Sequence, residues 1–274
     1  SKWDPIRGEW LANSIIALAD KKSIPDRTFP EEFTPYQMVT MIPLEQRRGI
    51  SQSISQGRNS GTPQNSNQWN IAEMIFNHSF CEPSIGRSYG DPHLNSFDNA
   101  SYSFQTVGEF VLSKSKAIPF EVQVRQMPQD QSFSLNNAVA MNVGGDRLSF
   151  YTDEKPDNQK QAFRLNGVGM QLSGRTYFLP KGGTIRLEGR NYIVSWPTGE
   201  SVIIDNRASR EMTFVNITVQ VFKCDQNQYE GLLGNLNGNH NDDFNGRDNN
   251  QQRPVFISSY GNFGLEQATA IAEK

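Results

Sequence analysis

The chain has 274 residues, with 26 basic and 29 acidic side chains, a net charge of −3 and a mean hydropathy of −0.61. No apolar stretch approaches the roughly 18 to 20 residues that a membrane-spanning helix needs, and no block of basic residues could neutralise a phosphate backbone. These features exclude a membrane span and argue against nucleic acid as a partner. The length allows one large domain or two small ones.

Residues 1–80 are expected to form a partly helical N-terminal region. Apolar side chains recur at near-helical spacing from Trp10 to Leu18, and the prolines that follow prevent continuation of that helix. Residues 33–48 fit either a short strand or a proline-broken helix, and both alternatives stay open.

The second half of this region begins with a polar segment. Residues 51–67 are mostly Ser, Gln, Asn and Gly, which is typical of a linker or a long surface loop near a domain boundary. Apolar residues between Trp69 and Ile75 then predict another short helix that leads into Cys81.

After Tyr89 the pattern changes to short strands, which predicts a mainly β domain over residues 81–274. Gly, Asn, Asp and Pro separate the apolar runs. These runs are 102–106, 110–112, 120–124, 138–143, 148–151, 183–187, 192–196, 201–204 and 214–222. Many short strands of this kind indicate an antiparallel β-sandwich or barrel, and residues 193–204 predict a hairpin with a four-residue turn.

Two motifs lie about 140 residues apart in this part of the chain. The first, residues 90–105, reads GDPHLNSFDNASYSFQ, and the second, residues 231–244, reads GLLGNLNGNHNDDF. Together they resemble the opening and closing signatures of the von Willebrand factor type D domain, over about residues 81–250. The resemblance implies an extracellular antiparallel β-sandwich of the kind found in adhesive, gel-forming and lipid-transport proteins, with Ca²⁺ held by the closing loop.

The closing motif has the composition of a calcium loop. Asn and Asp side chains offer hard oxygen ligands within nine residues, and Gly238 permits the tight turn that wrapping an ion requires. The alternative is a turn-rich loop without an ion. The resemblance implies a ligand set made of the side chains of Asp98, Asn235, Asn237, Asp242 and Asp243 with the main-chain carbonyl of Asn239.

The two cysteines, Cys81 and Cys224, are too few for a disulfide-dense scaffold and wrongly spaced for a Cys-x-x-Cys site. From the residues alone, one bridge or two free thiols are both open. Animal type D domains usually bridge a cysteine just before the opening motif to one at the position of Leu233, so the resemblance implies a shifted Cys81–Cys224 bridge here. Disulfide-linked polymerisation is not expected without further cysteines, and their scarcity favours a bacterial member.

The Asp91–Pro92 bond is a candidate for self-cleavage. An aspartyl carboxyl can attack its own carbonyl carbon while the proline nitrogen leaves, which forms a cyclic anhydride. The leaving nitrogen needs a proton, and histidine, the residue type that exchanges protons near neutral pH, follows at position 93. Several type D proteins with this motif cleave themselves, so the resemblance implies a site made of Asp91, Pro92 and His93. The alternative is that the motif only shapes the entry into the first strand.

The sequence therefore predicts a secreted or cell-surface module with a structural or adhesive role and an extracellular protein or cell-surface partner. The anhydride of a cleaved chain could be hydrolysed or trapped by an amine of a neighbour. A carbohydrate- or receptor-binding module without self-cleavage is the alternative, with Trp69, Tyr192 and Trp196 as aromatic residues that could stack on sugars or pack in the core. No Gly-x-Ser-x-Gly, Walker or His-Glu-x-x-His motif occurs. A hydrolase would have only Asp91 and His93 as candidates, and single-turnover chemistry on the chain itself explains both better, so a turnover enzyme is not expected.

Overall fold

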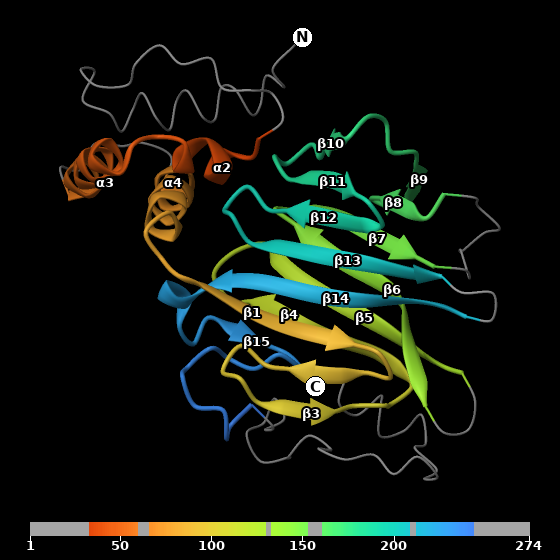
Figure 1. The fold of residues 1–274 in the computed structure, drawn as a ribbon. Coiled ribbons are helices and arrows are strands. Elements are labelled where there is room, and N and C mark those ends of the chain that lie inside the picture. The colour runs from red at the N-terminus through yellow and green to blue at the C-terminus, as the bar shows by residue number, and fades with distance from the viewer. Residues whose placement is uncertain (1–32, 60–65, 130–132, 153–160, 209–211, 244–274) are drawn as a thin grey trace.

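The computed structural model describes residues 33–59, 66–129, 133–152, 161–208 and 212–243. Among these residues, three helices lie in the N-terminal part: α2 (Pro35–Thr40), α3 (Leu44–Asn59) and α4 (Ser66–His78). The described residues after α4 form two antiparallel sheets that face each other (Figure 1). The prediction of a mainly β protein with a partly helical N-terminal region is confirmed.

The first sheet has eight strands in the order β10-β11-β12-β13-β14-β1-β2-β3. Their bounds are β1 Pro83–Tyr89, β2 His93–Asn95, β3 Ser101–Ser103, β10 Thr176–Phe178, β11 Thr184–Glu188, β12 Asn191–Ser195, β13 Ser201–Ala208 and β14 Thr213–Phe222. The predicted hairpin is β12–β13, in which Ser195 pairs with Ser201.

The second sheet has seven strands in the order β15-β4-β5-β6-β7-β8-β9. Their bounds are β4 Gly108–Ser115, β5 Phe120–Pro128, β6 Ser134–Val143, β7 Asp146–Tyr151, β8 Phe163–Leu165, β9 Val168–Met170 and β15 Tyr229–Glu230. Each of the nine predicted runs overlaps a strand of one of the two sheets.

Apolar side chains from the inner faces of both sheets form one core. Trp196 is 1% exposed, its ring lies 4.8 Å from that of Phe120, and its indole N–H donates to the carbonyl of Asn142 at 2.8 Å. Tyr192 packs against Phe150 and Phe163. Fully burying one large side chain contributes about 1.5–3 kcal/mol, so Trp196 has the core role rather than the sugar-stacking one. Tyr192 is partly buried and packs against this core. The side chain of Trp69 lies outside the described residues.

The expected loop at residues 51–67 is wrong over most of its length, because residues 51–59 continue α3 and α4 begins at Ser66. Ile50 and Ile54 lie one helical turn apart, and both are buried in a cluster with Ile75 and Phe76 of α4. Two buried side chains at this spacing are enough to fix a helix in a polar segment. Residues 60–65, and the helix predicted at 10–18, lie outside the described residues.

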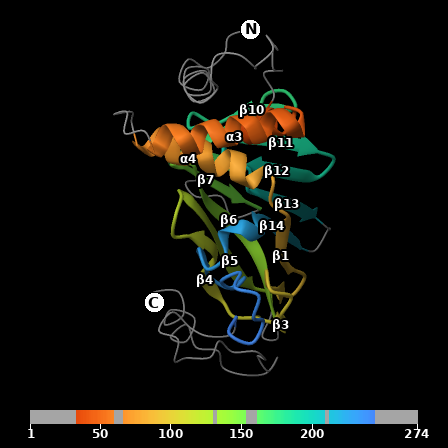
Figure 2. The same ribbon diagram turned by 90° about the vertical axis from the view of Figure 1, so that its left-hand side faces the viewer.

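The helices pack on one end of the sandwich, and Figure 2 shows them at the end opposite β3. The main-chain N–H of Tyr36 in α2 donates to the carbonyl of Pro197 at 3.1 Å, and its ring lies 5.2 Å from that of Phe222. A Cβ atom at Gly199, which has φ +109°, would lie 2.5 Å from the Tyr36 ring. The helix-to-sheet contact therefore requires glycine in this turn.

The predicted Cys81–Cys224 disulfide is confirmed. It joins the segment after α4 to the short 3₁₀ helix η2 (Lys223–Asp225); the two cysteines are 143 positions apart in sequence and their Cα atoms are 5.9 Å apart. Chain-entropy reasoning gives roughly 4–5 kcal/mol for closing a loop of this size. Within the described residues, no helix is long and apolar enough to cross a membrane.

Candidate functional site

The Asp91–Pro92 bond lies in the tight turn between β1 and β2, where Tyr89 pairs with His93. Gly90 has φ +62°, a conformation that glycine adopts at low cost, and its N–H donates to Asn216 Oδ1 at 2.9 Å. On the other side of the bond, the carbonyl of Pro92 accepts from the N–H of Phe104 at 2.8 Å. The main chain is thus held on both sides of the bond.

The side chains of Asp91 and His93 meet over this turn. His93 Nε2 lies 3.0 Å from Asp91 Oδ1, both side chains are 44% exposed, and His93 Nδ1 lies 3.0 Å from the hydroxyl of Ser103. Gln105 Nε2 donates to Asp91 Oδ2 at 2.5 Å. The three residues predicted for self-cleavage therefore lie together, and sequence reasoning missed Ser103 and Gln105.

The closing loop wraps around the carboxylate of Asp98, which lies between β2 and β3. Asp98 Oδ2 accepts from the main-chain N–H of Asn237 and Oδ1 from that of Gly238, both at 3.0 Å. Asn235 Oδ1 also accepts from the N–H of Asn237, at 3.1 Å, and Asn237 Nδ2 donates to Asp242 Oδ2 at 2.6 Å. The opening and closing motifs thus meet at one end of the sandwich.

The last two predicted ligands complete this loop. The carbonyl of Asn239 accepts from the N–H of Asp242 at 3.4 Å. Asp243 is 1% exposed and accepts from the hydroxyl of Ser96 through Oδ2, whereas Asp243 Oδ1 and Asp242 Oδ1 are buried without a hydrogen-bond partner among the described residues. Burial raises the pKa of the Asp243 carboxyl to about 6, and the charges of Asp98 and Asp242 act in the same direction.

The backbone next to Asp243 is shaped for a close approach. Gly234 has φ +86°, and a Cβ atom there would lie 2.0 Å from Asp243 Oδ1. Unpaired buried carboxylate oxygens are costly. The donor set, carboxylates with amide and main-chain oxygens, is of the kind that Ca²⁺ binds, and the calcium site stays a prediction.

The family model described as the von Willebrand factor type D domain matches residues 86–250, which is more than half of the chain and includes both motifs. The chain belongs to the von Willebrand factor type D domain family. Domains of this family are typically extracellular modules with adhesive or structural roles, and the disulfide agrees with that setting.

Two curated proteins are similar to part of this chain. Human "Sushi domain-containing protein 2" is 24% identical over an alignment of 172 residues that covers 59% of this chain and 20% of that protein. "Protein mesh" of Bombyx mori is 26% identical over an alignment of 186 residues that covers 61% of this chain and 11% of that protein. The chain therefore spans a fifth or less of the length of these relatives. The expected bacterial origin stays a prediction.

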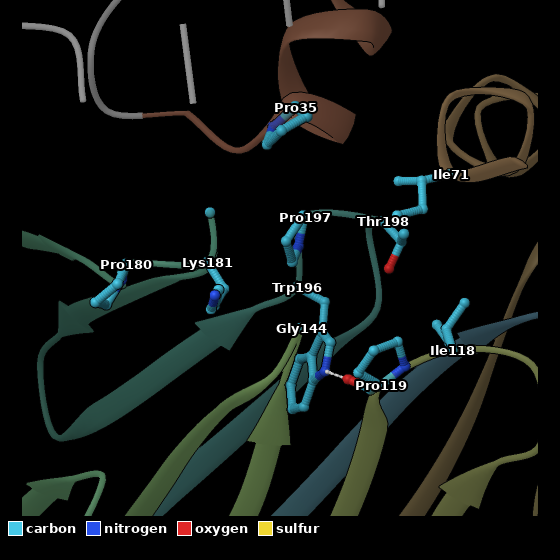
Figure 3. Close-up of a pocket in the computed structure, with 11 residues that line it drawn as sticks. Pro35, Ile71, Ile118, Pro119, Gly144, Pro180, Lys181, Trp196, Pro197 and Thr198 are labelled. Atoms are coloured by element: carbon cyan, nitrogen blue, oxygen red, sulfur yellow. Dashed lines mark hydrogen bonds between the residues drawn. The ribbon is translucent and has the colours of Figure 1, made fainter. Parts of the chain in front are cut away.

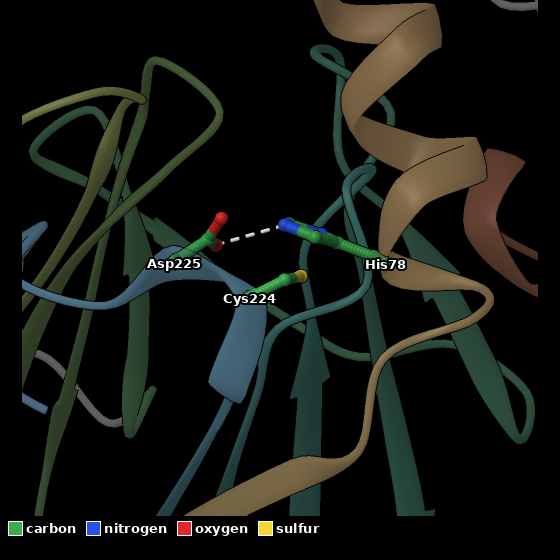
Figure 4. A group of neighbouring side chains, drawn as sticks. All are labelled: His78, Cys224 and Asp225. Atoms are coloured by element: carbon green, nitrogen blue, oxygen red, sulfur yellow. Dashed lines mark hydrogen bonds and ion pairs between the residues drawn. The ribbon is translucent and has the colours of Figure 1, made fainter. Parts of the chain in front are cut away.

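A second histidine–carboxylate group lies where α4, which precedes the matched residues, meets the sandwich. His78 points from the end of α4 toward Asp225 (Figure 4), with Nε2 2.8 Å from Asp225 Oδ2 and Nδ1 2.8 Å from the carbonyl of Thr198. Glu200, fully buried, places Oε1 3.6 Å from Nδ1 and accepts from the Thr198 hydroxyl through Oε2. Both ring nitrogens face oxygen atoms, an arrangement that favours the imidazole form protonated on both nitrogens.

The charges of this group agree with that protonation state. Burial by itself lowers the pKa of His78, but the hydrogen bond to Asp225 and the charge of Glu200 outweigh it, so the pKa lies above its ordinary value. Burial also raises the pKa of Glu200, and the charge of His78 opposes that rise. Among the described residues, His78, Cys224 and Asp225 are the one group of three His, Cys, Asp or Glu side chains whose donor atoms lie within 4.8 Å of one another. Since the sulfur of Cys224 is in the disulfide, this group is a structural contact rather than a metal centre.

A pocket of about 220 Å³ opens beside this contact, between the helices and the end of the sandwich. Pro35 and Ile71 line it from the helical side, and Pro119, Trp196 and Pro197 line it from the sandwich (Figure 3). The indole ring points away from the opening into the core. The pocket lacks the convergent polar groups that orient a ligand in a binding site, so it carries no functional assignment.

Proposed function

We propose that the chain is a calcium-stabilised extracellular module with a structural or adhesive role. Family membership supports the class of module. The observation that carries the calcium assignment is the pair of buried carboxylate oxygens, Oδ1 of Asp242 and Oδ1 of Asp243, that have no partner within the described residues. Bound Ca²⁺ supplies the positive charge that lets these carboxylates remain ionised out of contact with water.

The residues that would hold the ion come from both ends of the domain sequence. Asp98 follows β2, whereas Asp242 and Asp243 end the closing loop, and the N–H of Phe97 already donates to the carbonyl of Leu233 at 2.9 Å. An ion shared by these segments ties the first strands to the last segment of the described chain. Its loss would therefore loosen this end of the sandwich and leave the helical end intact.

Calcium titration of the full chain tests this proposal. We expect calorimetric binding of Ca²⁺ and a higher melting temperature with Ca²⁺ than with a chelator, and both effects should disappear in the double variant Asp242→Asn/Asp243→Asn. The matched control is Asp146→Asn, because Asp146 is also buried but accepts from the N–H of Lys181 at 2.7 Å, far from the loop in sequence. A double variant that keeps the full calcium-dependent shift would contradict the assignment.

We also propose that the module cuts itself once, between Asp91 and Pro92. The observation that favours this second activity is His93 Nε2, 3.0 Å from the Asp91 carboxylate in a turn held on both sides. Asp91 Oδ1 attacks the carbonyl carbon of its own residue, the bond to the Pro92 nitrogen breaks, and that nitrogen takes the proton from His93 Nε2. The products are a cyclic anhydride at Asp91 and a free amine at Pro92, and water or an amine of a neighbouring molecule then opens the anhydride.

Intact mass of the full chain, with and without reductant, tests the cut. Cys81 lies before the bond and Cys224 after it, so the fragments 1–91 and 92–274 separate only after reduction. We expect them to accumulate at mildly acid pH, and not in Asp91→Ala. Asp4–Pro5 is an internal control that has the same dipeptide without the preceding glycine or the following histidine. A single full-length mass at every pH, or equal cutting at both dipeptides, would refute folded-state self-cleavage.

A further inference from the structure

We propose that Gln105 is a catalytic residue of the self-cleavage, as the hydrogen-bond donor that stabilises the oxyanion formed on the Asp91 carbonyl. This inference rests on the self-cleavage proposed above. It assigns a role to a side chain that lies 14 positions after Asp91 in sequence and that the tertiary structure places against both reacting groups of that residue.

The side-chain amide of Gln105 contacts two oxygens of the same residue. Its Nε2 donates to Asp91 Oδ2 at 2.5 Å and lies 3.5 Å from the main-chain oxygen of Asp91. An amide nitrogen carries two hydrogens, so one can hold the carboxylate while the other serves the carbonyl. The carboxylate and the carbonyl that it attacks are therefore oriented by one group.

The position of Gln105 is fixed by its neighbour in the chain. Phe104 is fully buried, its ring lies 4.9 Å from that of Phe110, and its N–H donates to the carbonyl of Pro92. The residue before Gln105 thus binds the main chain on the leaving side of the scissile bond. Donors held in place before the reaction are those that stabilise developing charge best, since they need no reorganisation.

Each of the contacts that His93 and Gln105 make with Asp91 has a separate role in the reaction. Oδ1, the oxygen next to His93, forms the new bond, and Oδ2 becomes a carbonyl oxygen of the anhydride. In the tetrahedral intermediate, negative charge moves to the main-chain oxygen of Asp91, and the second N–H of the Gln105 amide can donate a hydrogen bond to it. When the intermediate collapses, the pair of electrons returns to the carbonyl, and the Pro92 nitrogen leaves with the proton from His93.

The test compares first-order cleavage rates of the full chain, followed by reduced intact mass from pH 5 to pH 8. Gln105→Leu keeps the approximate size but has no donor, and we expect it to cut about 10²- to 10³-fold more slowly than the unmodified chain, as expected for loss of one oxyanion donor. Gln105→Glu keeps the shape, and we expect its rate to recover toward acid pH, where a protonated carboxyl can donate. The matched control is Gln123→Leu, because Gln123 is an exposed amide on β5 that donates to Glu121 at 2.6 Å; it should cut at the unmodified rate.

The outcomes separate this inference from the one it rests on. If the unmodified chain cuts and Gln105→Leu cuts within about threefold of its rate, Gln105 is not the donor and self-cleavage stands. If the unmodified chain never cuts, both proposals fall. A folding defect in Gln105→Leu is recognised by its melting temperature, and the pH dependence of Gln105→Glu then decides, since a purely structural role predicts the same relative rate at every pH.

Discussion

The structure contains two histidine–carboxylate pairs with similar distances between the side chains but opposite surroundings, one in the opening turn and one where α4 meets the sandwich. In the opening turn, His93 lies 3.0 Å from Asp91 and both side chains are 44% exposed. At the helix contact, His78 lies 2.8 Å from Asp225, and the His78 side chain is fully buried. The same chemical pair is thus open to water at one site and enclosed at the other.

The number of partners explains what each pair can do. The ring of His78 has an oxygen acceptor at both nitrogens and Glu200 beside it, so its protons are committed to holding α4 on the sandwich. His93 faces a carboxylate on one side and a hydroxyl on the other, next to the Asp91–Pro92 bond and in contact with water. The comparison teaches that the surroundings, and not the residue types, separate a pair enclosed in a structural contact from one that is open to reaction.

The largest expected difference between the pairs is in stability. His78→Ala leaves Asp225 and the buried Glu200 without their cation, and removing one partner of a buried ion pair costs about 3–5 kcal/mol. His93→Ala removes an exposed pair, which contributes about 0.2–1 kcal/mol. Urea unfolding of the two variants, with the uncut fraction of each sample measured by reduced mass, checks this. Equal losses of unfolding free energy in the two variants would contradict the comparison.

The buried pair could not be predicted from the sequence, because its parts come from α4, from the β12–β13 turn and from η2. His78 and Glu200 are brought together only when the helices pack on the sandwich, and no local pattern marks either of them. Asp91 and His93, by contrast, are two residues apart in one turn, so their sequence motif was sufficient to predict that their side chains lie together. Gln105 stands in the same motif, but its contact depends on how the chain returns after β3.

The strands and helices, too, could be predicted where the local sequence pattern was sufficient and could not where packing decided. Strands whose inward side chains are large and apolar were predicted from alternation, whereas β1 places Ser84, Gly86 and Ser88 inward and gives no apolar signal. A Cβ atom at Gly86 would lie 2.7 Å from a methyl group of Leu233, so a small residue is needed where the closing segment packs. The polar composition of residues 51–59 favoured a loop, but burial of two isoleucines of α3 against α4 stabilises a helix there.

The next prediction concerns pH, and its sign follows from the two raised pKa values at the buried pair. His78 and Glu200 hold protons more tightly in the folded chain than in the unfolded one. Their contribution to the unfolding free energy is complete at acid pH and is lost as the pH rises through their pKa values in the folded chain. The loss begins above their pKa values in the unfolded chain, which are 4.5 for Glu200 and 6.5 for His78. The unfolding free energy should therefore fall with rising pH, by up to about 1.4 kcal/mol per pH unit for each additional proton bound.

Glu200→Gln sharpens that prediction, because glutamine does not titrate and keeps an oxygen acceptor for Thr198. We expect a flatter pH dependence of the unfolding free energy in this variant. Glu188→Gln, which changes a glutamate 55% exposed and paired with Arg186 at 2.9 Å, should retain the slope of the unmodified chain. Identical slopes in the two variants would show that the buried glutamate does not titrate with folding.

The smallest expected effect is that of salt on the unfolding free energy. This effect should differ between the two histidine–carboxylate pairs because only one of them is in contact with water. Raising the ionic strength from 0.1 M to 1 M shortens the screening length from about 10 Å to about 3 Å, which weakens exposed ion pairs far more than buried ones. The stability difference between the unmodified chain and His93→Ala should shrink by a few tenths of a kcal/mol. The difference for His78→Ala should stay constant, because water and ions do not reach that ring. A salt-dependent loss at His78 would mean that the helices open away from the sandwich in solution, and the structural role of the buried pair would have to be abandoned.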